Sequence, residues 1–568
     1  MKTANSLLRH YLSSFRKPLL VTLLVAFLSS IATILVPLSI GKFSALVFGL
    51  SGGKSGLFDF LPSEFVDTVP HFLIFFFILL MVKFILGFGQ RYLISSAGER
   101  LVNQIRIDLF EHQIGIDMSV YDEKGIGKYL LRYSGDLKSI QNYITRGIIG
   151  FVVDLGLLAI ALIFLGLINF QIALIIILVL PVISVPILLL NRKLNRVSEI
   201  RRNKRSNLLS FINQRLIGIL TVKAFNRHKP ELQKFNKRSQ VLLHQGLRYH
   251  ELASLIYVLI PFMLYSMLGV IMFTINKWQS SGFTIDKGAT LAAFFLLLSM
   301  LPVFRRLLKV PVVWDLGRIS LDKLARIWTL PNNYAQKKDD LILVQPRVSL
   351  QGLNFNFGDK PIFKGLNHRW EGRGIHLVRG NVGSGKTTLI KLLLGLYYPQ
   401  EGQVLIDGQS SAEVNERSLR KSVAVVSPDY PLLGRTVFES ISYSRKASKR
   451  KYSQELLDKL QSFLPLNERL QLTHRIGEGG SQLSKGQEML LLMVRALLTK
   501  KEILLLDEPF RHMDGQMRKH FYIILQELGS SKMILLFTKR TTIRQLTPVS
   551  SCSLDTGVSR RMLLKKAG

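Results

Sequence analysis

Cysteine is almost absent from this chain, since Cys552 is the only one among its 568 residues. A disulfide within the chain, a metal site built from several cysteines and a cysteine-protease domain ahead of the first apolar run are therefore excluded. Acidic residues are also scarce: 38 Asp and Glu stand against 75 Lys and Arg, for a formal net charge of +37. Such a charge is typical of proteins that bind nucleic acid. The distribution of the charge along the chain has to show whether that interpretation applies here.

Apolar residues, in contrast, are abundant. They make up 48% of the sequence, and the mean hydropathy is +0.26, which indicates a membrane protein with two or three domains. Six apolar runs before residue 315 reach the roughly 20 residues that a helix needs to cross a bilayer. They cover residues 18–38, 72–92, 147–169, 172–190, 252–275 and 288–308.

The positive charge lies on one side of these runs. Residues 191–251, between the fourth and fifth runs, contain fifteen Lys or Arg against three acids, and the N-terminus adds Lys2, Arg9, Arg16 and Lys17. The connections at 41–70 and 169–171 are nearly neutral. Because positive loops stay in the cytoplasm, we expect both termini and both long connections inside the cell. This pattern favours a multi-pass membrane protein over one that binds nucleic acid, and a bacterial inner membrane is the expected location.

The first apolar run has a second interpretation as a secretory signal, because a basic stretch precedes it. Its length of about 20 residues and the lack of an A-x-A-like site favour a first membrane span. Before it, apolar residues recur every three or four positions, which predicts a short helix at the headgroups, with a frayed terminus as the alternative. These residues are Leu7, Leu8, Tyr11, Leu12 and Phe15.

A glycine-rich run in the last third of the chain fits the pattern G-x-x-x-x-G-K-[ST]. It comprises Gly380, Asn381, Val382, Gly383, Ser384, Gly385, Lys386 and Thr387, followed by Thr388. In this pattern the glycines let backbone N–H groups surround phosphates, the lysine reaches the outer phosphates, and the hydroxyl of the threonine ligates Mg²⁺. The run follows an apolar segment and opens a helical one, which is the setting that a phosphate loop needs. ATP and Mg²⁺ are therefore the expected cofactors.

Two further motifs follow at fixed spacing. The first comprises Leu483, Ser484, Lys485, Gly486 and Gln487, and the second is an apolar run that ends in Asp507 and Glu508. With the six apolar runs, these motifs make the whole chain similar to an exporter-type half of an ABC transporter. The resemblance implies an all-α six-helix transmembrane domain fused to an α/β P-loop ATPase domain. We assign residues 1–330 to the first domain, 331–345 to a polar linker, and 346–568 to the second.

The resemblance extends to the cytoplasmic helices. Residues 97–112, 121–132 and 218–225 are similar to the family's intracellular extensions, whose short coupling helices transmit ATPase closure to the membrane. Residues 121–127 and 216–225 are the candidates for those helices, and solvated helical faces are the alternative.

The resemblance also implies roles in the ATP site. The loop around Ser484 and Gly486 would touch the γ-phosphate of ATP held by a second ATPase domain, so the chain must dimerise, and Asp514 matches the loop that links the two sites. Asp507 would hold Mg²⁺ through water, and Glu508 would orient and deprotonate the attacking water. Phe357 is the predicted platform for adenine, although Phe357 or Phe355 could instead be a core strand residue.

Three positions depart from the family pattern. Pro428 stands where a glutamine is usual, and it has no side-chain amide to ligate Mg²⁺ or hold water. Lys539 stands at the switch histidine, where it offers a cation but cannot accept a hydrogen bond. Lys485 replaces a glycine, a milder change. Lys386, Lys539 and Glu508 are the candidate catalytic residues of a site that we expect to bind ATP well and to hydrolyse it weakly.

The sequence of the membrane domain gives little information about the transported substrate. Lys83 and Asp154 fall inside the second and third runs, about 10 to 14 Å from the cytoplasmic edge. An ion pair between adjacent helices is one interpretation and a polar contact for the substrate is the other, because charges at such depth are costly.

Three functions remain open. One is an exporter half for a lipid, a peptide or an amphipathic compound. The second is a regulatory half that hydrolyses little ATP beside a different partner, and the lost glutamine and histidine favour such a heterodimer while Glu508 favours a homodimer. The third, a soluble ABC ATPase in DNA maintenance or translation, is nearly eliminated by the fused spans.

Overall fold

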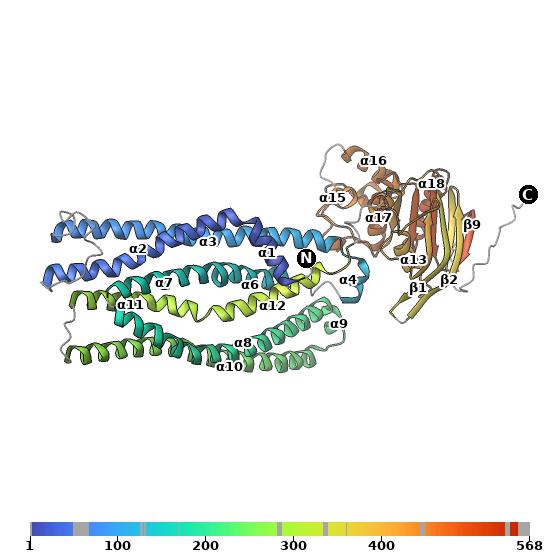
Figure 1. Ribbon diagram of the computed structural model, residues 1–568. Helices are drawn as coiled ribbons and strands as arrows, with labels where there is room; N and C mark the ends of the chain where they lie inside the picture. The colour runs from blue at the N-terminus through green and yellow to red at the C-terminus, as the bar shows by residue number, and fades with distance from the viewer. Residues whose placement is uncertain are drawn as a thin grey trace, which may run out of the picture. The chain divides into compact units, whose positions relative to one another are not determined.

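The computed structural model describes residues 3–48, 68–124, 129, 132–168, 170–280, 287–332, 339–358, 360–443, 449–539 and 546–554. It divides into two compact units. The helical unit comprises Met1–Ile114 and Lys124–Leu330, and the ATPase unit comprises Gly115–Glu123 and Pro331–Gly568 (Figure 1). Each unit is described by itself.

Long helices that run side by side make up the helical unit (Figure 1). The longer ones are α1 (Ala4–Ser14), α2 (Arg16–Phe48), α3 (Val69–Ile114), α7 (Gly150–Ile168), α8 (Phe170–Ile217), α10 (His228–Ser280), α11 (Lys287–Leu307) and α12 (Val310–Trp328). Shorter segments are the π-helices Arg132–Asp136 and Tyr143–Ile149, α6 (Leu137–Asn142) and α9 (Ile219–Ala224). Prolines 181, 186, 261 and 302 lie inside continuous helices.

Five helical stretches in the described part of the chain are long and apolar enough to span a membrane. They are Arg16–Ser44, Val69–Ile114, Leu137–Leu167, Phe170–Ile217 and His228–Lys277. They contain the first, second, fourth and fifth predicted runs and all of the third run, 147–169, except its last two residues. The sixth predicted run, 288–308, coincides with α11, which adjoins residues outside the described set and is not among the five. The chain is therefore a multi-pass membrane protein.

The N-terminal residues form an ordered helix, so the alternative of a frayed terminus is wrong for α1. Thr3 caps it, because its side chain accepts a hydrogen bond from the backbone N–H of Ser6. Leu7 and Tyr11 are buried, and the Tyr11 hydroxyl donates to Asp108 Oδ2 at 2.6 Å. The apolar face of the predicted headgroup helix thus packs against protein in this structure.

Asp154 is buried and paired, but not with the predicted Lys83. Arg306, near the end of α11, donates from Nε to both Asp154 oxygens at 3.0 and 2.9 Å and from Nη2 to Oδ1 at 2.6 Å. The predicted partner, Lys83, is therefore wrong. Because α7 packs against α11, it is the guanidinium of Arg306 that pairs with the Asp154 carboxylate. Forked geometry of this kind is the strong form of a charge-assisted hydrogen bond.

The ATPase unit contains two sheets. One is antiparallel, in the order β2-β1-β4-β5, and the other is parallel, in the order β6-β7-β8-β3-β9. The strands are β1 (Arg347–Phe357), β2 (Lys360–Glu371), β3 (Gly374–Arg379), β4 (Glu401–Ile406), β5 (Gln409–Ser410), β6 (Val423–Val426), β7 (Ile503–Asp507), β8 (Met533–Thr538) and β9 (Ser550–Ser553).

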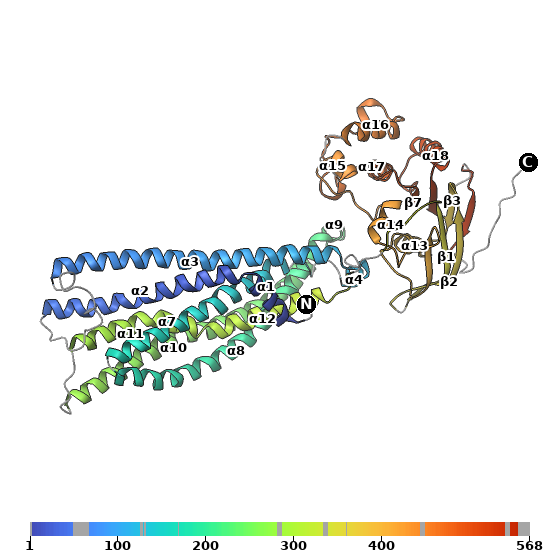
Figure 2. The ribbon, with the colours of Figure 1, turned by 45° about the horizontal axis from the view of Figure 1, so that its top comes forward.

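Helices cover the parallel sheet on both faces. They are α13 (Lys386–Leu393), α14 (Glu416–Ser422), α17 (Lys485–Leu497) and α18 (Gly515–Gly529), while α15 (Val437–Ser442) and α16 (Arg450–Leu460) pack against α17. Figure 2 shows α15 and α16 apart from the strands and α13 close to β1. Along β7, Leu504 and Leu506 face one apolar core while Ile503 and Leu505 face the other. Burial on both faces explains the continuous apolar run at this strand.

The ATPase unit extends beyond the domain limits expected from the sequence. Residues 333–338 of the expected linker lie outside the described residues, but Leu341 is already buried in the core beside β1. Residues Gly115–Glu123, expected in the first domain, also belong here. They include most of α4 (Met118–Lys124), and the remainder of the predicted coupling segment, 125–127, lies outside the described residues.

Candidate nucleotide site

Four loops leave the same edge of the parallel sheet, because β6, β7, β8 and β3 are neighbours that run in one direction. The glycine-rich loop follows β3, Glu508 follows β7, Lys539 follows β8, and Ser427 follows β6. Ligands of open α/β sheets bind at the carboxyl ends of the strands. The topology therefore places most of the predicted site residues at one edge.

The glycine-rich loop has the geometry of a phosphate cradle. Gly383 and Gly385 have φ of +85° and +89°, in the left-handed region that favours glycine, and Gly385 leads directly into α13. A Cβ on Gly385 would lie 2.7 Å from atoms of Ile362 and Phe363, so a larger residue would clash. The N-terminus of α13 thus faces the loop and offers backbone N–H groups to an anion.

Lys386 is 8% exposed and folds back over this loop. Its Nζ donates to the carbonyl oxygens of Gly380 at 2.7 Å and Asn381 at 2.9 Å, and it lies 3.7 Å from Glu508 Oε1. The ammonium group is therefore held at the mouth of the cradle by carbonyls that phosphate oxygens can replace.

Asp507, the last residue of β7, accepts hydrogen bonds from two hydroxyl groups. Its Oδ2 accepts a hydrogen bond from Thr387 Oγ1 at 3.3 Å and another from Ser427 Oγ at 3.2 Å. The carboxyl group is buried, and burial raises its pKa, whereas the hydrogen bond from Ser427 acts in the opposite direction. Ser427, 1% exposed, is a site residue that the sequence analysis missed. Its position directly after β6 and before Pro428 is the signal that could have identified it.

Glu508 adopts a φ of +46°, which is unusual for a residue other than glycine. Its backbone N–H donates to Phe537 O at 3.0 Å, which ties the turn to the neighbouring strand. Its Oε1 is buried and has no hydrogen-bond partner among the described residues. Strained backbone geometry and a buried acceptor without a hydrogen bond are features that cluster at functional sites.

Phe355 and Phe357 differ in exposure. Phe355 is buried and stacks on Tyr397 with ring centroids 5.5 Å apart, whereas Phe357 is 47% exposed and meets the same ring edge-on at 6.1 Å. Phe355 is thus the core residue, and Phe357 is free to accept a base on its outer face.

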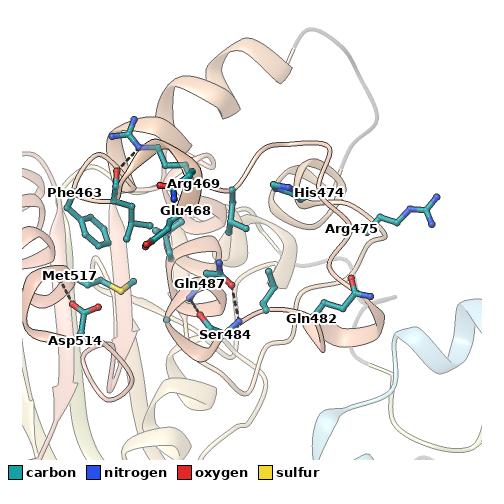
Figure 3. A pocket seen from close by; sticks show the side chains of 16 residues that line it. Phe463, Glu468, Arg469, His474, Arg475, Gln482, Ser484, Gln487, Asp514 and Met517 are labelled. Carbon is teal, nitrogen blue, oxygen red and sulfur yellow. Dashed lines mark hydrogen bonds between the residues drawn. The ribbon is translucent and has the colours of Figure 1, made fainter.

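The loop around Ser484 begins α17 with a capping box. Ser484 Oγ accepts from the Gln487 N–H at 3.2 Å, and the Ser484 N–H donates to Gln487 Oε1 at 3.0 Å. Lys485 points away with its Nζ 2.7 Å from Glu488 Oε2. Asp514 caps α18 through the Met517 N–H at 2.8 Å. Ser484, Gly486 and Asp514 line one cavity of about 600 Å³ (Figure 3).

Two of the three positions that depart from the family pattern follow strands of the parallel sheet and lie on the surface. Pro428 and Lys539 are exposed, directly after Ser427 and after β8. Lys539 forms no ion pair with a residue that the structure describes, and the residues that follow it, 540–545, lie outside that set. Leu483, Val382 and Thr388 complete the predicted loops, and Val382 is 81% exposed.

Comparisons with known proteins agree with this architecture. The family model of the ABC transporter transmembrane region matches residues 19–301, and the ABC transporter model matches residues 363–511, so together they cover about three quarters of the chain. An ATP-dependent lipid A-core flippase of Yersinia pestis is 25% identical over 475 residues, which cover 81% of this chain and 80% of that protein.

A flippase of the same description from Francisella tularensis is 24% identical over 478 residues, 81% of this chain and 77% of the relative. Among solved structures, a bacterial Atm1-family ABC exporter with ATP bound has a TM-score of 0.82 at 19% identity, over 96% of this chain and 95% of that one. That likeness concerns the fold.

Proposed function

We propose, from the premise that this chain belongs to the ABC transporter family, that it is one half of an exporter that moves an amphipathic, lipid-like compound across the membrane. The chain is an ATP-hydrolysing transporter with membrane helices and ATPase fused. The observation that carries the proposal is the meeting of the phosphate loop, Asp507, Glu508 and Ser427 at one sheet edge. The relatives named as lipid A-core flippases make a lipid the first substrate class to test.

The site residues fit a magnesium–ATP complex. Thr387 and Asp507 offer the hydroxyl and carboxylate oxygens that Mg²⁺ prefers, and Glu508 Oε1, which lies 3.7 Å from Lys386 Nζ, accepts no hydrogen bond from the described residues. A bound Mg²⁺ would neutralise charge that develops on the phosphates. Lys386 exchanges the carbonyls of Gly380 and Asn381 for phosphate oxygens. Glu508 accepts a proton from the attacking water.

In the family's head-to-tail dimer, the loop of residues 483–487, here called the signature loop, acts on ATP held by the partner's phosphate loop and not on ATP in the phosphate loop of the same chain. Ser484 and Gly486 lie on the wall of a cavity, and the capping box at Ser484 fixes the start of α17 beside it. We assign this cavity to the γ-phosphate end of ATP held by a partner half, with Asp514 beside it.

The second coupling helix supports the same dimer. α9 has no buried residue, and Leu216, Ile217, Leu220 and Phe225 on and beside it are 63 to 80% exposed. A cavity of about 1,020 Å³ in the ATPase unit has an apolar wall. We assign the exposed face of α9 to the corresponding cavity of the partner half, because apolar patches of this kind mark interaction sites.

Pro428 and Lys539 favour a partner of a different sequence. This chain's signature loop keeps Ser484 and Gly486, whereas its own site lacks the glutamine amide and the switch histidine. The asymmetry suits a pair in which one site turns over and the other holds ATP. A homodimer, which Glu508 favours, is the second candidate. The basic cytoplasmic segments and the bacterial relatives support an inner-membrane protein with both termini inside.

The test compares two variants in the complex purified from its own membranes and reconstituted. Ser484→Arg blocks the partner's phosphate loop, so it should abolish transport and ATP hydrolysis, while Lys386→Ala should leave appreciable hydrolysis. Ser530→Arg, an exposed serine of the same unit outside the site, is the matched control. Mass spectrometry identifies the co-purifying half and lipids. Equal loss in both variants, with one polypeptide in the complex, would contradict the heterodimer.

A further inference from the structure

One cavity of the ATPase unit combines an apolar wall with positive charge. Its volume is about 1,020 Å³, and in the dimer proposed above it receives the α9 region of the partner half. The described residues that line it include six Lys or Arg but one acid, Asp429. Leu433, Tyr443 and Tyr452 add exposed apolar surface. An apolar contact explains these three side chains, but it does not explain the excess of cations.

Three of the six cations are held within the ATPase unit. Arg495 is buried and donates to two backbone carbonyl oxygens at 3.0 and 2.8 Å. Arg420 pairs with Glu416 at 2.6 Å, and Lys501 donates to a backbone carbonyl at 3.0 Å. These three charges are therefore satisfied by the unit itself and leave the other three for an occupant of the cavity.

The other three cations, here called the rim lysines, are Lys421, Lys449 and Lys500. They are exposed, and none forms an ion pair with a residue that the structure describes. They come from three different elements, since Lys421 lies on α14, Lys449 precedes α16 and Lys500 follows α17. Lys500 Nζ lies 5.2 Å from the centroid of the Tyr452 ring, at the edge of the apolar wall. Because charges of opposite sign face each other across specific interfaces, the rim lysines favour an acidic occupant.

The α9 region of this chain has the opposite character. Residues 216–230, here called the α9 segment, contain Lys223, Arg227 and Lys229, all exposed, and no Asp or Glu. The next acid along the chain, Glu231, is paired with two cations of its own unit at 2.6 and 3.0 Å. In a homodimer, the basic α9 segment of one copy would meet the rim lysines of the other. Like charges opposed in this way disfavour the complex.

We propose that the cavity selects a partner half whose counterpart of the α9 segment is acidic, so that charge discriminates against a second copy of this chain. The proposal rests on the dimer and the α9 contact proposed above, and it adds the sign of the charge that the partner carries. It is independent of Pro428 and Lys539, because none of the charges that carry it belongs to the nucleotide site. Charge complementarity of this kind governs the choice of partner more than it governs affinity.

The experiment measures the dissociation constant of the homodimer by sedimentation of the purified full chain in detergent, at low salt, with ATP and with Glu508→Gln as the parent. Lys421→Glu with Lys500→Glu makes the rim acidic and should lower the dissociation constant by roughly tenfold, an effect that added salt reduces. Lys223→Glu with Arg227→Glu should act in the same direction from the other side. All four substitutions together oppose like charges again, so this variant should return toward the parent.

A control variant and the natural partner complete the test. Lys364→Glu with Arg373→Glu changes net charge equally at two exposed cations outside the cavity, and it should leave the dissociation constant unchanged. The half that co-purifies from native membranes, identified by mass spectrometry, should carry a net negative charge in its counterpart of the α9 segment.

The outcomes separate this inference from the function on which it rests. The proposal is wrong if the acidic rim leaves self-association unchanged, if the variant with four substitutions associates as tightly as either pair, or if the control variant gains as much. A basic counterpart segment in the natural partner would also overturn it, and in each of these cases the exporter assignment stands. If the Glu508→Gln parent binds no ATP, the proposed function itself is wrong, and the proposal falls with it.

Discussion

Ser427→Ala should weaken the handling of magnesium–ATP, because Ser427 is the side chain from the β6 loop that touches Asp507. The family's usual amide at the next position is replaced by Pro428, which leaves the Ser427 hydroxyl as the hydrogen-bond donor that this loop supplies. Removing it leaves Thr387 Oγ1, at 3.3 Å, as the remaining side-chain donor to the buried carboxylate among the described residues. The substitution deletes one oxygen and creates almost no cavity.

A hydrogen bond to a charged group contributes about 1.5 to 3 kcal/mol. The Ser427 bond is 3.2 Å long, beyond the usual distance for a hydroxyl donor, so the lower end applies. A loss of about 1.5 kcal/mol corresponds to roughly a tenfold rise in the concentration of magnesium–ATP needed for half-maximal hydrolysis.

The assay is steady-state ATP hydrolysis by the reconstituted complex over a range of magnesium concentrations at fixed ATP. Ser440→Ala is the matched control: Ser440 is fully buried in the same unit, and its hydroxyl donates to Val437 O at 2.8 Å. An unchanged magnesium dependence in Ser427→Ala, or an equal change in Ser440→Ala, would refute the assignment of Ser427 to this site.

Three further outcomes are expected. Burial lowers the pKa of His376, so the unfolded chain binds a proton near pH 6.5 that the folded chain does not; stability should fall below that pH by up to about 1.4 kcal/mol per pH unit, and calorimetry of His376→Gln should show a shallower fall. Asp154→Asn should lower the free energy of unfolding by about 1 kcal/mol, because the Arg306 side chain is half-exposed. The double variant Asp154→Arg, Arg306→Asp should restore part of this loss, as measured by thermal inactivation. Lys539→His with Pro428→Gln should raise ATP turnover more than either change alone, because both groups act on one water.

For each of these three predictions, one experimental result would contradict it. Parallel stability curves for His376→Gln and the unmodified chain would show that this histidine titrates normally in the fold. An unaltered inactivation temperature in Asp154→Asn would mean that the pair with Arg306 adds nothing. No gain in the double variant would mean that the site has been reshaped beyond those two positions.

The sequence predicted the elements whose local chemistry is self-contained. The phosphate loop and the strand before Asp507 are each set by neighbours in sequence, and the structure has β3 followed by a loop and α13, and the strand β7. The apolar runs predicted helices for the same reason, because length and composition decide which segments enter a bilayer.

Contacts between distant segments were not predictable in this way. The depth of Asp154 indicated a partner of opposite charge, but only the packing of α7 on α11 selects Arg306 over Lys83. Phe355 and Phe357 alternate along one strand, and burial decides which of them is core. The placement of Asp122 against Tyr397 and Lys391 joins segments more than 260 residues apart, as the separations of 275 and 269 show.

ATP binding and turnover by the purified chain, measured side by side, test the central claim most directly. The intact loop at Lys386 predicts nucleotide binding tight enough to measure, while Pro428 and Lys539 predict slow hydrolysis by the chain on its own. Brisk turnover by a homodimer, abolished by Glu508→Gln, would contradict the account of a site that binds ATP well and hydrolyses it weakly.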